Sequence, residues 1–201
     1  MNLGAMAVTV AAPPVARRVA MGVGLLLCVW PAAALTNDAA PEPAARVQAA
    51  FLRNFARYVA WPARAFAGER SPWTVCVLGS DPFGAALEGT FDGRTEQGRS
   101  FEVVRANEPE QLPACHIVFL GDASATKRRA VLAQLKGRPV LTVANAPDFL
   151  NEGGVIRLTV SERVEMGINL DQARAASLTI PAKMLEVARD VVDNGALRRL
   201  R

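Results

Sequence analysis

The chain has 201 residues, of which 51% are hydrophobic and 21% are charged, so it can bury a core and is not expected to be disordered. Its length suits one domain rather than two. The formal net charge of +4 comes from scattered basic residues without an aromatic-lined basic face, which argues against a nucleic-acid-binding protein. We interpret the basic cluster at 127–129 as a solvated helix end and the basic residues of 193–201 as a loose tail.

The first 34 residues have the three parts of a secretory signal peptide. Arg17 and Arg18 supply the positive start, residues 19–30 form an apolar run, and Ala32 and Ala34 supply the small residues of a cleavage site. The apolar run is too short to span a bilayer comfortably, and an uncleaved anchor is the alternative interpretation. We expect export and cleavage near Ala34. Loss of the two arginines then lowers the net charge from +4 to +2.

A long amphipathic helix opens the mature chain. Residues 35–45 are polar and rich in Ala and Pro, and we expect them to form a flexible linker. A helix is predicted from Pro43 to Ala60, because apolar residues recur at helical spacing and the Trp61-Pro62 pair ends the pattern. Its predicted inner face carries Val47, Ala50, Phe51, Phe55, Tyr58 and Val59.

Strand and helix patterns alternate through the remaining residues. Strands are predicted at 73–78, 100–105, 116–120 and 139–143, with a hairpin formed by 155–160 and 164–168. Helices are predicted at 82–87, with Asp81 as N-cap, and at 125–135, 171–176 and 181–192. This order indicates an α/β fold: a single compact domain over 46–192, with a mostly parallel sheet, helices on both faces and an antiparallel hairpin near the C-terminal part.

The sequence offers no recognisable catalytic set. The only histidine, His116, follows Cys115, but neighbouring residues of a strand point to opposite faces, so the two side chains should diverge. One histidine and few thiols do not make a typical zinc site. The nucleophile elbow and the usual phosphate-binding loops are also missing from the sequence. We therefore expect a protein that is not an enzyme and that carries neither metal nor cofactor.

Two cysteines remain once the leader, with Cys28, is removed. Cys76 and Cys115 each lie in or beside a predicted buried strand. In an oxidising compartment they are expected to form a disulfide, and two buried free thiols are the alternative. Their spacing excludes a C-x-x-C redox pair.

The ends of two predicted strands form a candidate ligand site. Gly79, Ser80 and Asp81 follow the strand at 73–78, and Gly121 and Asp122 follow the strand at 116–120. Ligands of open α/β sheets sit beyond the carboxyl ends of the strands. A small-molecule-binding sensor subunit is therefore one hypothesis for the function.

Several segments together resemble the YfiR family of periplasmic proteins. They are VQAAFLRNFARYVAWP (47–62), CVLGSDPFG (76–84), CHIVFLG (115–121), GRPVLTV (137–143), GGVIRL (153–158) and INLDQARAASLTIPAKMLEVAR (168–189). The resemblance runs in order over about 46–192. Its most specific parts are the helix that ends in Trp-Pro and the Ile-Asn-Leu segment.

The resemblance implies a periplasmic homodimer that restrains an inner-membrane diguanylate cyclase, YfiN, through the periplasmic sensor domain of that enzyme. Such a protein lowers cyclic-di-GMP and opposes biofilm formation. The resemblance also implies that Cys76 and Cys115 form a disulfide. YfiR has a second disulfide for which this chain has no cysteines, so redox control through that bridge does not carry over. We expect contacts with the membrane partner on the first and the last predicted helix, at Phe51, Phe55, Tyr58, Trp61, Met184 and Leu185. Ordinary packing in the core is the alternative interpretation for these residues, and the favoured one for most of them.

Overall fold

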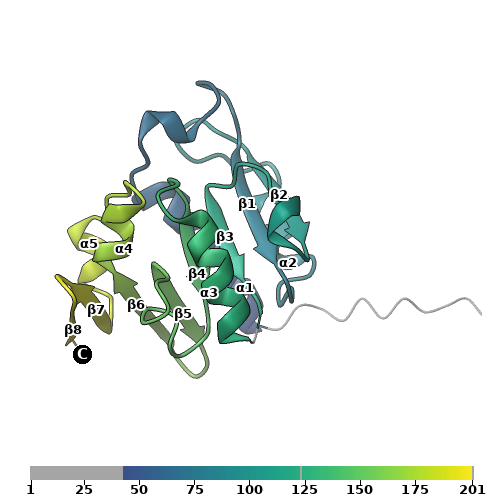
Figure 1. Cartoon of the computed structure of the whole chain (residues 1–201). Coiled ribbons are helices and arrows are strands. Elements are labelled where there is room, and N and C mark those ends of the chain that lie inside the picture. Colours follow the sequence, from purple (N-terminus) through teal and green to yellow (C-terminus); the bar gives the residue numbers. More distant parts are fainter. Residues whose placement is uncertain (1–42, 123, 201) are drawn as a thin grey trace, which may run out of the picture. The chain divides into compact units, whose positions relative to one another are not determined.

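The strands form one eight-stranded sheet in the computed structural model, which describes residues 43–122 and 124–200 (Figure 1). The sheet order is β2-β1-β3-β4-β5-β6-β7-β8. The strands are β1 (Trp73–Leu78), β2 (Phe101–Ala106), β3 (Ile117–Leu120), β4 (Leu141–Ala144), β5 (Ile156–Val160), β6 (Val164–Asn169), β7 (Asp190–Asp193) and β8 (Ala196–Arg199). The five strands from β2 to β5 in this order are parallel, and β6 pairs with β7 in parallel. The pairs β5–β6 and β7–β8 are antiparallel.

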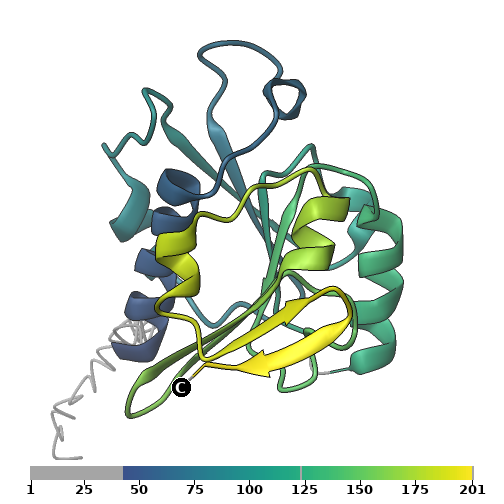
Figure 2. The same cartoon turned by 90° about the vertical axis from the view of Figure 1, so that its left-hand side faces the viewer.

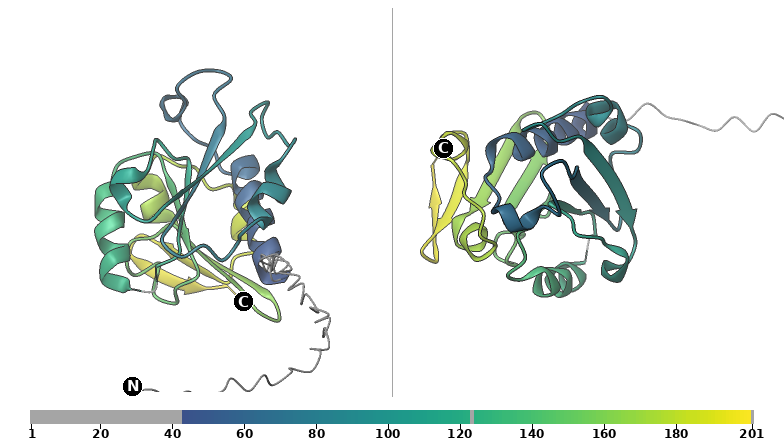
Figure 3. Two further views of the ribbon diagram at one scale, coloured as in Figure 1. Left: turned by 90° about the vertical axis from the view of Figure 1, so that its right-hand side faces the viewer. Right: turned by 90° about the horizontal axis from the view of Figure 1, so that it is seen from above.

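Helices cover both faces of the sheet, which confirms the predicted fold class. They are α1 (Pro43–Tyr58), α2 (Ala86–Phe91), α3 (Ala125–Leu135), α4 (Leu170–Ala175) and α5 (Ala182–Leu185), with short 3-10 turns at Ala63–Ala65 and Pro109–Gln111. Helices α1 and α2 pack on one face and α3 on the other (Figures 2 and 3). None of the helices within the described residues is long and apolar enough to cross a membrane.

The central strands are apolar on both sides because both sides are covered. All six residues of β1 are buried. Val75 and Val77 belong to the core beneath α1 and α2, whereas Cys76 and Leu78 belong to the core beneath α3. This alternation follows from the two-residue period of a strand. The largely apolar run that predicted β1, in which Thr74 is the one polar residue, is therefore the expected pattern of a buried parallel strand.

Helix α1 is present as predicted, but its inner face is only partly the predicted one: Phe55 and Val59 are buried, and Phe51 packs against the core. The helix begins at Pro43, so residues 43–45 of the predicted linker belong to it. Its buried residues include Ala49, Leu52 and Ala56, whereas Tyr58 and Val47 are exposed. Apolar residues therefore lie along two sides of the helix. The side that packs on the sheet contains small alanines, which let the helix backbone come close to the strands. The predicted signal peptide and the rest of the linker lie outside the described residues.

The prediction of a helix over 181–192 is wrong beyond α5, and so is that of a loose tail. Helix α5 ends at Leu185, and residues 190–193 form β7, which turns through Asn194 and Gly195 into β8. Both turn residues have positive φ, 53° and 72°. Asn-Gly is the preferred pair for a two-residue hairpin loop, because these residues tolerate that conformation.

The helix predicted over 82–87 lies further along the chain. Asp81 accepts a hydrogen bond from the backbone N–H of Phe83 at 2.7 Å, which closes a turn, and α2 begins only at Ala86. Asp81 is therefore not the N-cap of a helix. A short acidic side chain satisfies a turn as well as a helix end, so the sequence pattern does not separate the two.

Candidate functional site

An apolar groove opens between α1 and α5, and we call it the α1/α5 groove. It encloses about 160 Å³ and is lined by Phe51, Asn54, Phe55, Tyr58, Met166, Lys183, Met184 and Val187. Phe55 and Met184 are buried, whereas Tyr58 is 41% and Val187 60% exposed. Four of the six residues predicted to contact a partner thus meet in one place: Phe51, Phe55, Tyr58 and Met184.

A backbone bridge brings the two walls of the groove together. Ala60 and Thr179 exchange two N–H···O=C hydrogen bonds, each 3.0 Å long. This pairing ties the end of α1 to the segment that leads into α5, although the two are far apart in the sequence. Ile180, buried, follows directly, and Pro181 precedes the first turn of α5. The position of α5 over α1 is therefore fixed by the chain that enters it.

Cationic side chains surround the exposed aromatic ring at the rim. The guanidinium of Arg57 lies 5.6 Å and the ammonium of Lys183 lies 5.8 Å from the centre of the Tyr58 ring. Cations at this distance are attracted to the face of an aromatic ring. The groove therefore combines an apolar floor with a positively charged rim.

The other two predicted partner residues lie outside the groove. Trp61 packs edge-on against Trp73 with ring centres 5.0 Å apart, and Leu185 packs against the core. Sequence reasoning missed Met166 and Val187, which do line the groove. Met166 reaches it from β6, and Val187 was assigned to a continuous helix that does not form. The position of Tyr58 at the groove can be predicted only when it is known which face of α1 packs on the sheet.

The predicted strand-end site lies at the carboxyl ends of β1 and β3, which are neighbours in the sheet; β2 pairs with the other edge of β1. Gly79 and Asp122 line a cavity of about 250 Å³ together with residues 107–110 and 127–128. This is the switch point of the sheet order, where ligands of such folds bind. Of the five predicted residues, these two face the cavity.

Protein groups engage the strand-end residues, Asp122 among them. Asp81 accepts a hydrogen bond from Arg105 at 2.7 Å. Gly121 approaches the carbonyl of Ser80 so closely that an added Cβ would lie 1.8 Å from its oxygen. The backbone N–H of Ser124 holds the pKa of Asp122 below its usual range, with a further contribution from Lys127. The two loops therefore brace each other directly.

Gly121→Ala should lower the free energy of unfolding by about 1–3 kcal/mol, because the methyl group meets backbone rather than a movable side chain. Urea denaturation measures this change. Gly89→Ala is the matched control: it lies in α2 with open space around it, and should be neutral or stabilising by up to about 1 kcal/mol. Equal stability of Gly121→Ala and the wild type would contradict the contact.

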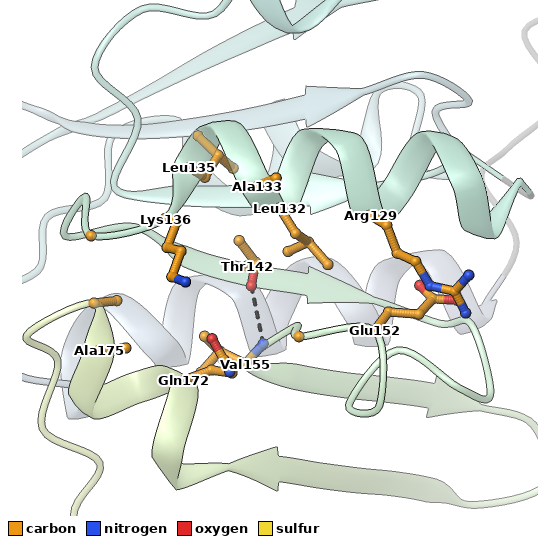
Figure 4. Close-up of a pocket in the computed structure, with 13 residues that line it drawn as sticks. Arg129, Leu132, Ala133, Leu135, Lys136, Thr142, Glu152, Val155, Gln172 and Ala175 are labelled. Atoms are coloured by element: carbon orange, nitrogen blue, oxygen red, sulfur yellow. Dashed lines mark hydrogen bonds between the residues drawn. The ribbon is translucent and has the colours of Figure 1, made fainter.

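A third cavity, of about 230 Å³, lies between α3 and α4 and is shown in Figure 4. Thr142, which is buried, accepts a hydrogen bond from the backbone N–H of Val155 at 3.0 Å, and this ties β4 to the start of β5. Arg129, Leu132 and Lys136 line the α3 side. None of the predicted site residues lines this cavity.

The predicted disulfide between Cys76 and Cys115 is present. It joins the middle of β1 to the residue that precedes His116 and β3, with a Cα–Cα distance of 6.0 Å and a sequence separation of 39. Both cysteines are buried in the core beneath α3. The bridge therefore links two neighbouring central strands.

His116 is buried on the other side, among aromatic rings. It stacks on Phe66 at 4.5 Å and meets Trp73 edge-on at 5.3 Å. Its Nδ1 accepts a hydrogen bond from the backbone N–H of Thr74 at 3.0 Å. Burial, together with the charge of Arg99, holds the pKa of His116 below its ordinary value of 6.5, against the opposing influence of the Ala65 backbone. The neutral ring is therefore the form that the fold accommodates.

Stability should fall on mild acidification because of this histidine. In the unfolded chain His116 takes up a proton near pH 6.5, whereas in the fold it does so only at lower pH, so the unfolded state binds more protons between the two values. The free energy of unfolding should therefore decline as the pH drops below about 6.5. Thermal unfolding between pH 8 and pH 5 measures this, and His116→Phe should flatten the curve. An unchanged slope in that variant would contradict the assignment.

A comparison with known protein families matches the part of the chain that carries these sites. A family model described as YfiR/HmsC-like matches residues 45–189. The match begins in α1 and ends just before β7, so it includes the α1/α5 groove, both cysteines and the strand ends. Within the described residues, no group of three or more His, Cys, Asp or Glu side chains is arranged to hold a metal ion.

Proposed function

The chain belongs to the YfiR/HmsC-like family, and on this basis we propose that it binds the periplasmic sensor domain of an inner-membrane diguanylate cyclase and restrains that enzyme. Proteins of this family are periplasmic regulators of diguanylate cyclase signalling and not catalysts. The signal peptide over residues 1–34, with cleavage near Ala34, delivers the chain to that compartment. Binding would lower cyclic-di-GMP in the cytosol and oppose biofilm formation.

The observation that carries the proposal is the α1/α5 groove. Its floor is apolar, and Tyr58 and Val187 leave large apolar surfaces open to solvent at its rim. Exposed apolar patches with a polar surround are typical of protein interaction sites. A groove of this size suits one or two apolar side chains of a partner, which is how the central anchors of an interface bind.

The proposal is tested in cells that lack the chromosomal copy of this gene. We expect cyclic-di-GMP to rise on deletion and to return to the original level with the wild-type gene. The double variant Tyr58→Asp/Val187→Asp should not restore it, because two charged carboxylates would replace the apolar surface that the partner is proposed to bury. Both residues are exposed, so the variant should accumulate normally.

Arg138→Asp, an exposed change after α3, is the matched control and should restore the level fully. Unchanged cyclic-di-GMP on deletion would contradict the proposed function. Full restoration by the groove variant would contradict the proposed surface.

The mature chain is proposed to be a homodimer, as the resemblance to YfiR implies. Analytical ultracentrifugation of the exported protein tests this directly. A single species at the mass of one chain across micromolar concentrations would contradict it.

A second candidate function is that of a small-molecule sensor subunit. The observation that favours it is the cavity of about 250 Å³ at the carboxyl ends of β1 and β3, lined by Gly79 and Asp122. Thermal-shift screening against nucleotides and amino acids tests it. A shift in the wild type that Asp122→Asn abolishes would support this function, and a flat response across the panel would exclude it.

A further inference from the structure

The α1/α5 groove continues along the surface into a region rich in arginine. A neighbouring depression of about 320 Å³ shares Met166 and Val187 with the groove. A further one, of about 280 Å³, shares Glu165 and Arg189 with the second. The three depressions therefore form one continuous surface, which begins at α1 and reaches β8.

The arginines of this surface are held in two similar arrangements. In the first, Glu165 pairs with Arg163 at 3.0 Å and with Arg189. In the second, Asp190 pairs with Arg157 at 2.5 Å and with Arg199 at 3.4 Å. We call these six residues the arginine cradle. Each carboxylate lies between two guanidinium groups, so each arrangement carries one positive charge in excess.

Part of the cradle is fixed and part of it faces solvent. The Asp190 side chain is 6% exposed and that of Arg157 is 19%, whereas Arg163 and Arg199 are 74% and 71% exposed. Ion pairs that face solvent add little to stability, so the fold does not depend on the outer arginines. A guanidinium that is already oriented loses less freedom when it binds a carboxylate with two parallel hydrogen bonds. The cradle is therefore suited to bind carboxylates.

We propose that the groove and the cradle are one docking surface for an acidic segment of the membrane partner. The segment would place an apolar side chain in the α1/α5 groove and two or more carboxylates on the cradle. Charge complementarity selects this occupant, because the groove rim at Arg57 and Lys183 and the cradle are both positively charged. The proposal rests on the proposed function and adds the chemistry of the partner to it.

A polypeptide fits these observations better than a free anion does. A small carboxylate or phosphate would occupy the cradle alone and would not need the apolar link through Met166 and Val187. The continuity of the three depressions instead suits a segment that bears both kinds of side chain.

Photo-cross-linking at the junction tests the proposal. In the full chain, Val187→p-benzoylphenylalanine places the reactive group between the groove and the cradle. The cross-linked protein is isolated from whole cells, and the attached segment is identified by mass spectrometry. We expect a periplasmic segment of an inner-membrane signalling protein that carries an apolar residue within a few positions of at least two Asp or Glu.

Charge variants of the cradle supply the second readout. Arg163→Glu/Arg189→Glu should lower the yield of this cross-link at least about fivefold, since like charges then oppose each other. The milder variant Arg163→Gln/Arg189→Gln should lower the cross-link yield less. It tests the same residues if the charge reversal disturbs folding. Lys136→Glu/Arg138→Glu at the end of α3 has the same charge change at two exposed residues and should leave the yield unchanged.

The outcomes separate this inference from the proposed function. A cross-linked membrane signalling protein whose attached segment lacks Asp and Glu would overturn the inference and leave the proposed function standing. A yield that both cradle variants leave unchanged would overturn it in the same way. Normal cyclic-di-GMP after gene deletion would instead overturn the proposed function.

Discussion

Arg128→Met should lower the free energy of unfolding by about 3–5 kcal/mol, because it leaves a buried carboxylate without its partner. Arg128 donates to both oxygens of Glu152, at 2.7 and 2.6 Å, and to the carbonyl of Asp122 at 2.7 Å. The two side chains are only 6% and 1% exposed. This pair, which holds the pKa of Glu152 below its usual range, fixes α3 to the turn after β4. Urea denaturation of the purified protein measures the loss.

Two further variants separate the cost of an unpaired charge from the loss of packing. Arg128→Met/Glu152→Leu removes both charges and should recover most of the stability, since a buried pair is worth little over apolar residues of similar size. Lys127→Met breaks the neighbouring pair with Asp122, whose lysine is 73% exposed, and should cost less than about 1 kcal/mol. A double variant as unstable as the single one would show that shape, not charge, dominates this site.

Removal of the disulfide should cost about 4 kcal/mol. Cys76 and Cys115 close a loop with a sequence separation of 39 residues, and the chain-entropy model assigns a loop of this length a stabilisation of about that size. Cys76→Ala/Cys115→Ala should therefore shift the urea midpoint strongly downward. Strands β1 and β3 are also joined by parallel pairing that does not involve the bridge, so the variant is expected to fold in the absence of denaturant.

Reduction of the wild type is the matched control for this prediction. Dithiothreitol should lower the wild-type midpoint nearly to that of the double variant and leave the variant itself unchanged. If the variant is as stable as the oxidised wild type, the bridge contributes no net stabilisation. A different midpoint for the reduced wild type and the variant would measure the cost of the two smaller side chains.

The sequence correctly predicted the helices and strands whose spacing of apolar residues agrees with their burial in the fold. Strand β1 and helix α3 have the predicted bounds, because one is a largely apolar run of strand-forming residues and the other has a serine cap, Ser124, at its start. The hairpin of β5 and β6 also formed as predicted. In these segments the sequence period and the tertiary environment favour the same structure, so sequence reasoning succeeds.

The errors arose where two structures fit the same pattern. Residues 181–192 show helical spacing, but the β-branched pair Val191-Val192 and the Asn194-Gly195 turn favour a hairpin, which pairs with β6. The turn was the signal that could have located β7. Helix α1 has apolar residues on two sides, and either side could have packed on the sheet. Which side is buried depends on the tertiary packing and does not follow from the helix sequence.

The docking surface could be predicted only in part. Phe51, Phe55, Tyr58 and Met184 were selected because aromatic and apolar residues gather on two helices, and the structure places them around one groove. The arginine cradle could not be predicted from any local sequence pattern. Arg157, Glu165 and Asp190 come together through the register of β5, β6 and β7, which is a long-range property of the sheet.

The central claim is that this protein restrains a membrane diguanylate cyclase through the α1/α5 groove. The most direct measurement is the rate of cyclic-di-GMP formation by the cyclase from the same cells, reconstituted in lipid nanodiscs, with and without the purified mature chain. We predict that the wild-type chain lowers this rate and that Tyr58→Asp/Val187→Asp leaves it unchanged. A rate that the wild-type chain does not alter would contradict the account, as would equal inhibition by the two proteins.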